Sequence, residues 1–332
     1  MKLIKWLFTL GLIVLFSIIG TAYLTLQNNI QLPGGAAEYR YSIAEGLGSS
    51  QVANDLAAQK IIVHSAVMKI YLRITQKTRA LKAGEYQLTN NMNMLDMLKL
   101  FEQGLSIQHQ FTIIEGWNIR ELLAALRSKT EIKQTLPAGV PDDLMERLGE
   151  PNLHPEGAFL PETYSFSSGT TDIQFLRRAR SHMQDYLQQA WEQRSEKSVV
   201  KTPYEALILA SIVEKETGAA HERPLISGVF TNRLNIGMRL QTDPTVIYGM
   251  GEAYDGDIRF RDLRKPTPYN TYTIYGLPPT PIAMPGKHAI DAALNPESTK
   301  ALYFVSRNDG THIFSSTLKA HESAVDKYQR NR

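Results

Sequence analysis

Two glutamates at the end of an apolar segment are the strongest candidates for chemistry in this chain. Residues 204–213 are almost entirely apolar, and Glu214 and Glu216 follow them directly before Gly218. A helix that is apolar nearly all round is buried, and its dipole disfavours a carboxylate near its C-terminal end. Partial burial raises the pKa of a carboxyl group, so such a group can donate a proton near neutral pH. The residues alone leave both glutamates open, and equally leave open that both only form ion pairs with nearby basic side chains.

The segment from Gly237 to Gly286 is the second candidate, and its composition predicts a long loop. It holds seven of the sixteen prolines and five tyrosines. A loop of this length is either disordered or functional, and its aromatic content argues against disorder. Polar groups beside tyrosines suit a sugar-binding cleft, in which rings stack on pyranose faces and polar side chains bind hydroxyls; a stiff structural lid is the alternative. The candidate binding residues are Gln241, Thr242, Asp243, Asn270 and Tyr272.

Several other kinds of chemistry are disfavoured. The absence of cysteine excludes a thiol nucleophile and a cysteine-ligated metal. The eight histidines are scattered and form no H-E-x-x-H pair, and neither a G-x-S-x-G elbow nor a glycine-rich phosphate loop is present. We therefore expect no metal ion and no other cofactor. The net charge of +3 and the short basic cluster at Arg177–Arg180 favour a solvated surface over a nucleic-acid site.

The N-terminus has the pattern of a membrane-spanning helix. From Trp6 to Leu26, 21 consecutive residues are uncharged and rich in Leu, Ile, Phe and Val. At ~1.5 Å per residue this helix is about 31 Å long, which matches a hydrocarbon core of ~30 Å. Lys2 and Lys5 precede it and no basic residue follows until Arg40, so the N-terminus is expected in the cytoplasm. A cleaved signal peptide is the alternative, but its apolar region would be shorter and no suitable small-residue cleavage site follows.

The remaining pattern predicts an α+β fold, because short strands and helices are mixed irregularly. An internal echo supports a strand–turn–helix unit used twice, since Ile43–Gly46 recurs as Ile113–Gly116 seventy residues later. Thr202-Pro203 fits the start of the apolar helix, and Asn308-Asp309-Gly310 is typical of a hairpin turn. The expected elements are a strand near 41–43, helices within 52–61 and 67–74, a strand at 85–88, helices at 94–101, 172–193 and from 203, strands at 302–305 and 312–314, and a terminal helix at 317–328.

Several motifs resemble the YceG-like family, and the likeness runs over essentially the whole chain. The central run is long and therefore specific. The matching stretches are Glu214–Thr217, Arg233–Gly249, Asn270–Thr273 and Gly276–Pro279, preceded by Lys82–Tyr86, Glu156-Gly157 and Pro161–Tyr164.

The resemblance implies a domain order and a location. Residues 1–27 would form the anchor with a short cytoplasmic N-terminus, 28–38 a linker, 39–110 a small LysM-like domain and 111–332 a mixed α+β catalytic domain. The protein would be a single-pass protein of the bacterial inner membrane with its catalytic domain in the periplasm.

The resemblance also implies a reaction and its acid. The essential glutamate of the family is the second acid of the Glu-Lys-Glu-Thr motif, here Glu216. The implied activity is endolytic, non-hydrolytic cleavage of the β-1,4 bond between N-acetylmuramic acid and N-acetylglucosamine in peptidoglycan, leaving a 1,6-anhydromuramoyl end. Glu162 joins the loop residues as a substrate-binding candidate. The implied partners are glycan strands and, for a role in terminating nascent strands, peptidoglycan synthases.

Two alternatives stay open beside this expectation. One is a peptidoglycan hydrolase in which Glu216 works with Glu162 or Asp243 as a second acid. The other is a non-catalytic glycan-binding scaffold that uses the LysM-like domain. The mass of the products distinguishes a hydrolase from a lytic transglycosylase. The release of soluble fragments distinguishes an enzyme from a non-catalytic scaffold.

Overall fold

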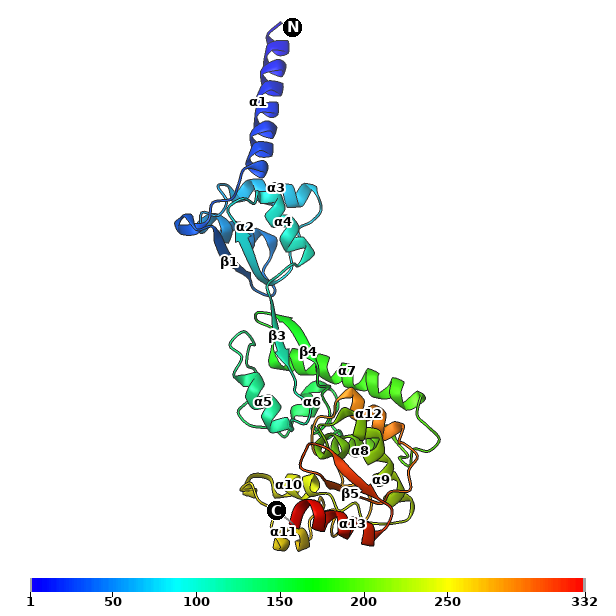
Figure 1. Ribbon diagram of the computed structural model, residues 1–332. Coiled ribbons are helices and arrows are strands. Elements are labelled where there is room, and N and C mark those ends of the chain that lie inside the picture. Colours follow the sequence, from blue (N-terminus) through cyan, green and yellow to red (C-terminus); the bar gives the residue numbers. More distant parts are fainter. Residues whose placement is uncertain (1, 331–332) are drawn as a thin grey trace. The chain divides into compact units, whose positions relative to one another are not determined.

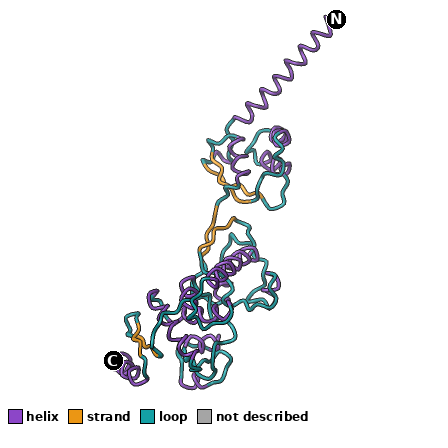
Figure 2. The backbone as a smooth tube through the Cα atoms, turned by 90° about the vertical axis from the view of Figure 1, so that its right-hand side faces the viewer, coloured by secondary structure: helices purple, strands orange, loops and turns teal. Residues whose placement is uncertain are grey.

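Short strands and many helices alternate along the chain in the computed structural model, which describes residues 2–330. The chain forms two compact units. Unit 1 extends from the N-terminal helix to His109 and includes Ser165–Thr170, whereas unit 2 contains Gln110–Tyr164 and the chain from Thr171 onward. Within the described residues each sheet has only two strands, and helix and loop make up most of the backbone (Figure 2). This mixture agrees with the expected α+β class.

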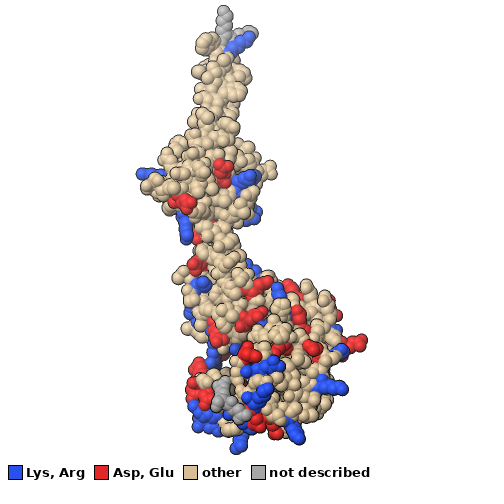
Figure 3. Space-filling model, viewed as in Figure 1, with Lys and Arg blue, Asp and Glu red and all other residues tan. Residues whose placement is uncertain are grey.

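The N-terminal helix α1 (Lys2–Gln27) belongs to unit 1. It is the one helix within residues 2–330 that is long and apolar enough to cross a membrane, with a mean hydropathy of 2.2 for Ile4–Gln27. Its side chains are exposed over most of its length, and Figure 3 shows it as a column without acidic or basic groups below its first turns. Only near its C-terminal end is it partly covered, where Leu26 packs on the core of unit 1. The expected apolar helix is therefore present.

The rest of unit 1 is built on a β–α–α–β order followed by one more helix. Its strands β1 and β2 pair antiparallel, with Tyr41 opposite Tyr86. The buried faces of the helices cover one side of this pair, and Tyr86 and Phe101 stack at 4.7 Å between ring centres in the core. The elements are β1 (Glu38–Ile43), α2 (Ser49–Ala58), α3 (Ser65–Ile74), β2 (Gly84–Thr89) and α4 (Met94–Gln103), shown in Figure 1.

The segment expected as a linker, residues 28–38, packs on unit 1. Ile30 and Leu32 are buried in its core. The backbone N–H of Ile30 donates to the carbonyl of Met92 at 2.8 Å, and that of Gln31 donates to Ile61 at 3.0 Å. Because apolar side chains at alternate positions are covered, the segment adds to the core in spite of the turn residues that follow it.

The internal echo corresponds to a second β–α–α–β segment. After each first strand a glycine with left-handed backbone makes the turn into the helix: Gly46, with φ 83°, in unit 1 and Gly116, with φ 78°, in unit 2. Strand β3 pairs with β4 in a two-stranded sheet, as β1 and β2 form a two-stranded sheet in unit 1. The prediction of a strand–turn–helix unit used twice is therefore confirmed. The second copy consists of β3 (Gln108–Thr112), α5 (Ile119–Arg127), α6 (Leu144–Leu148) and β4 (Thr163–Ser167).

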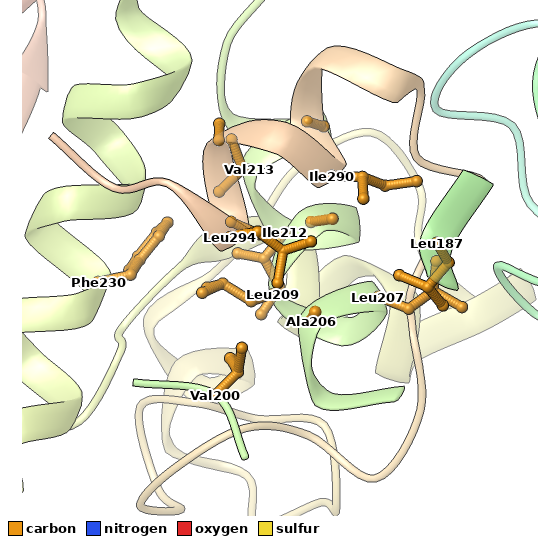
Figure 4. Packing of buried hydrophobic residues seen from close by; sticks show 14 of the residues in the cluster. Leu187, Val200, Ala206, Leu207, Leu209, Ile212, Val213, Phe230, Ile290 and Leu294 are labelled. Carbon is orange, nitrogen blue, oxygen red and sulfur yellow. The ribbon is translucent and has the colours of Figure 1, made fainter. Parts of the chain in front are cut away.

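The main core of unit 2 surrounds the helix that carries the candidate glutamates. This helix, α8 (Pro203–Glu216), lies among α7 (Asp172–Glu192), α9 (Arg223–Asn235) and α12 (Lys287–Leu294). Figure 4 shows Leu187 of α7, Phe230 of α9 and Leu294 of α12 around the side chains of α8. All eight residues from Ala206 to Val213 are buried, because every face of α8 has a neighbour. Such burial makes α8 a rigid support for its last turn.

The segment 237–286 differs from the expected long loop, because it contains short helices. The prediction overlooked that Pro244 occupies the first turn of a helix, where its missing N–H costs nothing. The expected hairpin and terminal helix are present. The remaining elements are α10 (Asp243–Met250), α11 (Phe260–Arg264), β5 (Tyr303–Ser306), β6 (His312–Ser315) and α13 (Leu318–Val325), with single turns at Pro33–Gly35, Ala220–Glu222, Gly251–Ala253 and Asp326–Arg330.

Candidate active site

The C-terminal end of α8 presents Glu216 to the candidate site. The helix starts as its sequence suggests, with the Thr202 side chain accepting from the N–H of Glu205 and with proline at the first position. It ends at Glu216 because Thr217 adopts an extended conformation, with φ −145° and ψ 135°. Gly218 lies two residues beyond that end. The buried helix thus fixes the position of a carboxyl group at its last residue.

Glu216 has the protonation behaviour of a general acid. Burial raises the pKa of its carboxyl group from 4.5 to about 7. The negative charge of Asp243 raises this pKa further, whereas the hydrogen bond from Thr242 and the positive charges of His312 and Arg233 lower it. Because the balance lies near neutrality, a substantial fraction of the carboxyl groups carries a proton at pH 7. The site can therefore donate and accept a proton under the same conditions.

Buried threonines position Thr242, which is the hydrogen-bond partner of Glu216. The hydroxyl of Thr242 donates to Oε1 of Glu216. The N–H of Thr242 donates to Oγ1 of Thr271 at 3.1 Å, and Oγ1 of Thr245 donates to the Thr242 carbonyl at 2.8 Å. All three threonines are buried. Thr242, expected among the substrate-binding residues, thus has its hydroxyl engaged with the acid.

Asp243 and Tyr272 form a second pair beside the acid. The Tyr272 hydroxyl donates to Oδ1 of Asp243 at 2.6 Å. Burial first, and then this hydrogen bond, raise the pKa of Tyr272 above its ordinary value, so the phenol stays protonated. Asp243 is exposed, and its charge acts on Glu216. The structure therefore brings together four of the expected residues: the acid, Thr242, Asp243 and Tyr272.

Two basic side chains near Glu216 were not expected from the sequence. Arg233 is buried, donates to the carbonyls of Leu302 at 2.6 Å and Leu240 at 2.5 Å, and holds its guanidinium 5.4 Å from the centre of the Tyr303 ring. Both carbonyls accept from the guanidinium group, so Arg233 links the loop after α9 to the start of the β5–β6 hairpin. Its position inside the family-like run was the only sequence signal for it.

His312 is the other basic side chain, and it is held by a buried acid. Its Nδ1 lies 2.7 Å from Oε2 of Glu222, and its backbone N–H donates to Oε1 of the same carboxylate at 2.9 Å. Glu222 is buried. The two residues are ninety positions apart, so spacing along the chain could not reveal the pair.

Glu214 has a structural role, because both of its carboxylate oxygens are bound within the protein. Its Oε1 accepts from Arg223 at 2.9 Å and its Oε2 accepts from the N–H of Gly286 at 2.9 Å. The side chains of both charged partners are less than a tenth exposed. Burial raises the pKa of Glu214, and the bonds from Gly286 and Arg223 oppose this shift. The ion-pair interpretation that the sequence left open thus describes Glu214.

The other expected binding residues lie in different surroundings. Gln241 is exposed, with a left-handed φ of 47°, directly before Thr242. The Asn270 side chain is buried, and its amide donates to three backbone carbonyls between 2.8 and 3.1 Å while its oxygen accepts from the Tyr272 N–H. Glu162 is held by Lys287 at 3.1 Å and by His182 at 3.2 Å. Gln241 is therefore free to meet a ligand, Asn270 shapes the loop that carries Tyr272, and Glu162 belongs to another cluster.

A groove of about 980 Å³ in unit 2 reaches the neighbours of the acid. Lys215 and Pro244, which adjoin Glu216 and Asp243 in sequence, line it together with the tyrosines at 248, 254 and 269. Glu156 lies at its wall, buried, and accepts from the Tyr248 hydroxyl at 3.1 Å. Burial raises the pKa of Glu156 to about 7, against the bond from the Ile119 N–H. The size and the aromatic lining suit a ligand of several rings.

No group of three or more His, Cys, Asp or Glu side chains is arranged to hold a metal ion in the described part of the chain. A carboxyl group with its pKa near 7, at the end of a rigid helix and near an aromatic groove, is the kind of site that carbohydrate-cleaving enzymes use for acid–base chemistry.

Comparison with known proteins identifies the family. The model of the YceG-like family matches residues 41–327, and the chain belongs to this family. The endolytic murein transglycosylase of Bacillus subtilis strain 168 is 30% identical over 308 residues, which are 86% of this chain and 84% of that protein. The endolytic murein transglycosylase of Streptococcus pneumoniae D39 is 28% identical, and the match covers 90% of this chain but only 60% of the longer relative.

A solved structure supports the same assignment. The crystal structure of a yceG-like protein from Listeria monocytogenes matches with a TM-score of 0.54 and 27% identity, over 86% of this chain and 99% of that one. The resemblance seen in the motifs of the sequence is thereby confirmed at the level of the family.

Proposed function

We propose that Glu216 is the acid and base of this chain, which is an endolytic transglycosylase of murein, the peptidoglycan of the bacterial wall. The activity follows from the relatives named for it, one of them 30% identical over most of both chains. The observation that carries the residue assignment is the place of Glu216 in the Glu-Lys-Glu-Thr motif at the end of the buried helix α8, where burial raises its pKa to about 7. A carboxyl group with this pKa is protonated often enough to act as an acid and ionised often enough to act as a base.

In the first step, the protonated Glu216 donates to the glycosidic oxygen as the bond from that oxygen to C1 of N-acetylmuramic acid breaks. The leaving N-acetylglucosamine thus departs as a neutral alcohol. Asp243 lies close enough for its charge to act on Glu216, and it raises the proton affinity of the acid. Asp243 is exposed beside the acid, and a carboxylate there also favours the positive charge that develops at C1.

In the second step, the C6 hydroxyl of the same muramic residue attacks C1, and the Glu216 carboxylate removes the hydroxyl proton. One glycosidic bond is broken and one internal 1,6-anhydro bond is formed, so no water is consumed and Glu216 regains its proton. The hydrogen bond from Thr242 stabilises the carboxylate between the steps. One acid is enough for this cycle, unlike the pair of acids in glycoside hydrolases.

Sugar binding is proposed for the groove and for the exposed polar groups beside the acid. The tyrosines of the groove offer faces for pyranose rings, and Gln241 and Tyr272 lie next to the Thr242–Asp243 pair. Glu162 and Asn270 have partners within the protein, which supports positioning roles for both.

The anchor and unit 1 are proposed to keep the site near newly made glycan. The length and hydropathy of α1 support a membrane span with the N-terminus in the cytoplasm and unit 2 on the outer, periplasmic side. The β–α–α–β order of unit 1, with its strands antiparallel, supports the LysM-like expectation. A role in ending nascent strands beside peptidoglycan synthases is consistent with this anchoring, and recovery of a synthase after cross-linking in cells would test it.

The decisive experiment is mass spectrometry of the products released from purified sacculi. A 1,6-anhydro end is one water lighter than a reducing end, so a transglycosylase and a hydrolase that pairs Glu216 with Asp243 or Glu162 give different masses. Reducing ends would refute the non-hydrolytic mechanism. Binding to sacculi without any released fragment would favour the non-catalytic scaffold.

A further inference from the structure

We propose that the exposed face of α3 lies in the interfacial layer of the membrane that α1 crosses, so that unit 1 rests on an anionic lipid surface. This inference rests on the membrane anchoring proposed above. It concerns a surface of unit 1 that the transglycosylase reaction does not use.

An apolar stripe runs along the outer side of α3. Val67, Ile70 and Ile74 are spaced by three and four residues, which places them on one face of α3, and Val63 lies just before the helix. The side chains of Val63, Ile70 and Ile74 are 66%, 59% and 75% exposed. The opposite face is already used, because Met68 and Leu72 are fully buried in the core of unit 1. The helix is therefore apolar on two sides, and only one side has a partner within the protein.

The position of α3 relative to α1 identifies that partner as lipid. Contacts join α1 to α3 and to α4, and the covered residues of α1 are confined to its last turns, at Ala22, Thr25 and Leu26. The apolar run of α1 ends at the same Leu26, so this contact lies at the level where the hydrocarbon core ends. Trp6 and Tyr23, both exposed, mark the two ends of the span as interfacial aromatic residues do.

The charges around the stripe match an anionic lipid surface. Arg73 is exposed on α3 beside the stripe, Lys69 of the same helix donates to Asn54 of α2, the helix has no acidic residue, and Lys60 is exposed just before it. An amphipathic helix in an interface buries its apolar face by ~5–10 Å and holds its basic groups at the lipid phosphates. Each basic residue near an anionic surface strengthens the attraction.

Leu105 supplies a matched control within the same unit. It is an exposed leucine, at 61%, and follows the C-terminal end of α4, where the chain leaves for β3. In unit 1 the chain leaves for β3 at the end away from α1 (Figure 1). The membrane contact predicted for Ile70 does not extend to it.

The absence of cysteine makes a site-specific experiment straightforward. The full-length variants Ile70→Cys and Leu105→Cys are each labelled with an environment-sensitive fluorophore and reconstituted into vesicles of phosphatidylcholine and phosphatidylglycerol. Lipids that carry a nitroxide near the headgroup report contact by quenching. We expect quenching at position 70 to be several-fold stronger than at position 105, and to decrease when Ile74→Glu is added or when phosphatidylglycerol is left out.

The outcomes separate the two proposals. Flotation of the labelled protein with the vesicles tests the anchor, and failure to float would refute the anchoring itself. Flotation with equal, weak quenching at both positions would overturn the contact of α3 with lipid while leaving the anchor intact. A label at position 70 that is shielded from water but not quenched by lipid would show that a protein covers the stripe, and would also overturn the proposal.

Discussion

Replacing Glu216 with glutamine separates the chemistry of the carboxyl group from its contribution to the fold. The substitution keeps the shape of the side chain and its ability to accept from Thr242, but removes the transferable proton. General acid–base catalysis contributes ~10²–10⁴-fold to rate. Because the same carboxyl group acts in both steps of the proposed reaction, we expect release of anhydro-ended fragments to fall by at least this factor.

The same substitution has a predictable effect on stability. A pKa raised from 4.5 to about 7 means that the folded protein favours the neutral form by up to about 3 kcal/mol, at ~1.4 kcal/mol per tenfold change. The folded state therefore binds the proton more tightly than the unfolded chain, and stability contributed by this group is lost as the pH rises through about 7. The glutamine variant cannot ionise, so we expect it to match the wild type at about pH 4.5 and to melt a few degrees higher at about pH 8.5.

Two neighbouring substitutions complete the test. Glu205→Gln changes an acid in the first turn of α8 that only caps the backbone of Lys201, and should keep wild-type turnover. Glu214→Gln removes the charge that binds Arg223 in a buried pair, and should lower stability by ~3–5 kcal/mol. Product analysis on sacculi and thermal melting at two pH values are the measurements. Wild-type turnover by Glu216→Gln, or a variant that melts below the wild type at about pH 8.5, would refute the reasoning.

Two further substitutions probe the surroundings of Glu216, and a third probes the packing of α9. Thr242→Val removes a bond that stabilises the Glu216 carboxylate, so the alkaline limit of kcat/KM should move to higher pH and the rate should fall; an unchanged pH profile would contradict this. Tyr272→Phe removes the hydroxyl that donates to Asp243, so the negative charge of Asp243 should act more strongly on Glu216 and raise the alkaline limit of kcat/KM. The melting temperature should fall by no more than a few degrees. A pH–rate profile and a melting curve measure the two effects. Gly228→Ala would place a Cβ against the Glu297 carbonyl oxygen, so overpacking should lower the free energy of unfolding by about 1–3 kcal/mol in chemical denaturation, and equal stability would show that the backbone yields.

Local signals in the sequence determined much of the fold. Thr202 and Pro203 mark the start of α8, and the Asn308–Gly310 turn joins β5 to β6, because caps and tight turns depend on a few neighbouring residues. The segment 237–286 was misread as one loop. Its helices are only five to eight residues long, too short for a periodic pattern to appear.

The choice between the two glutamates shows where such reasoning ends. Periodicity places both on α8, but all faces of that helix are buried, so it could not separate them. The two glutamates differ in their partners: Glu214 forms an ion pair with Arg223, whereas Glu216 accepts a hydrogen bond from Thr242. These partners come from other elements, and the pairing of Glu222 with His312 is more distant still. From the sequence, only the family motif favoured Glu216 over Glu214.

The division of β3 and β4 between the two units bears on how this protein can be taken apart. The chain passes from unit 1 to unit 2 after His109, returns for Ser165–Thr170, and leaves again at Thr171. In the returning segment, Ser167 bonds with Ser106 at 3.0 Å and with Gln108 at 3.1 Å. A cut before residue 110 would therefore leave the tip of β4 without its partners, and no single cut yields two intact pieces. An exchange of unit 1 between relatives would have to carry both of its segments to keep the β3–β4 pair complete.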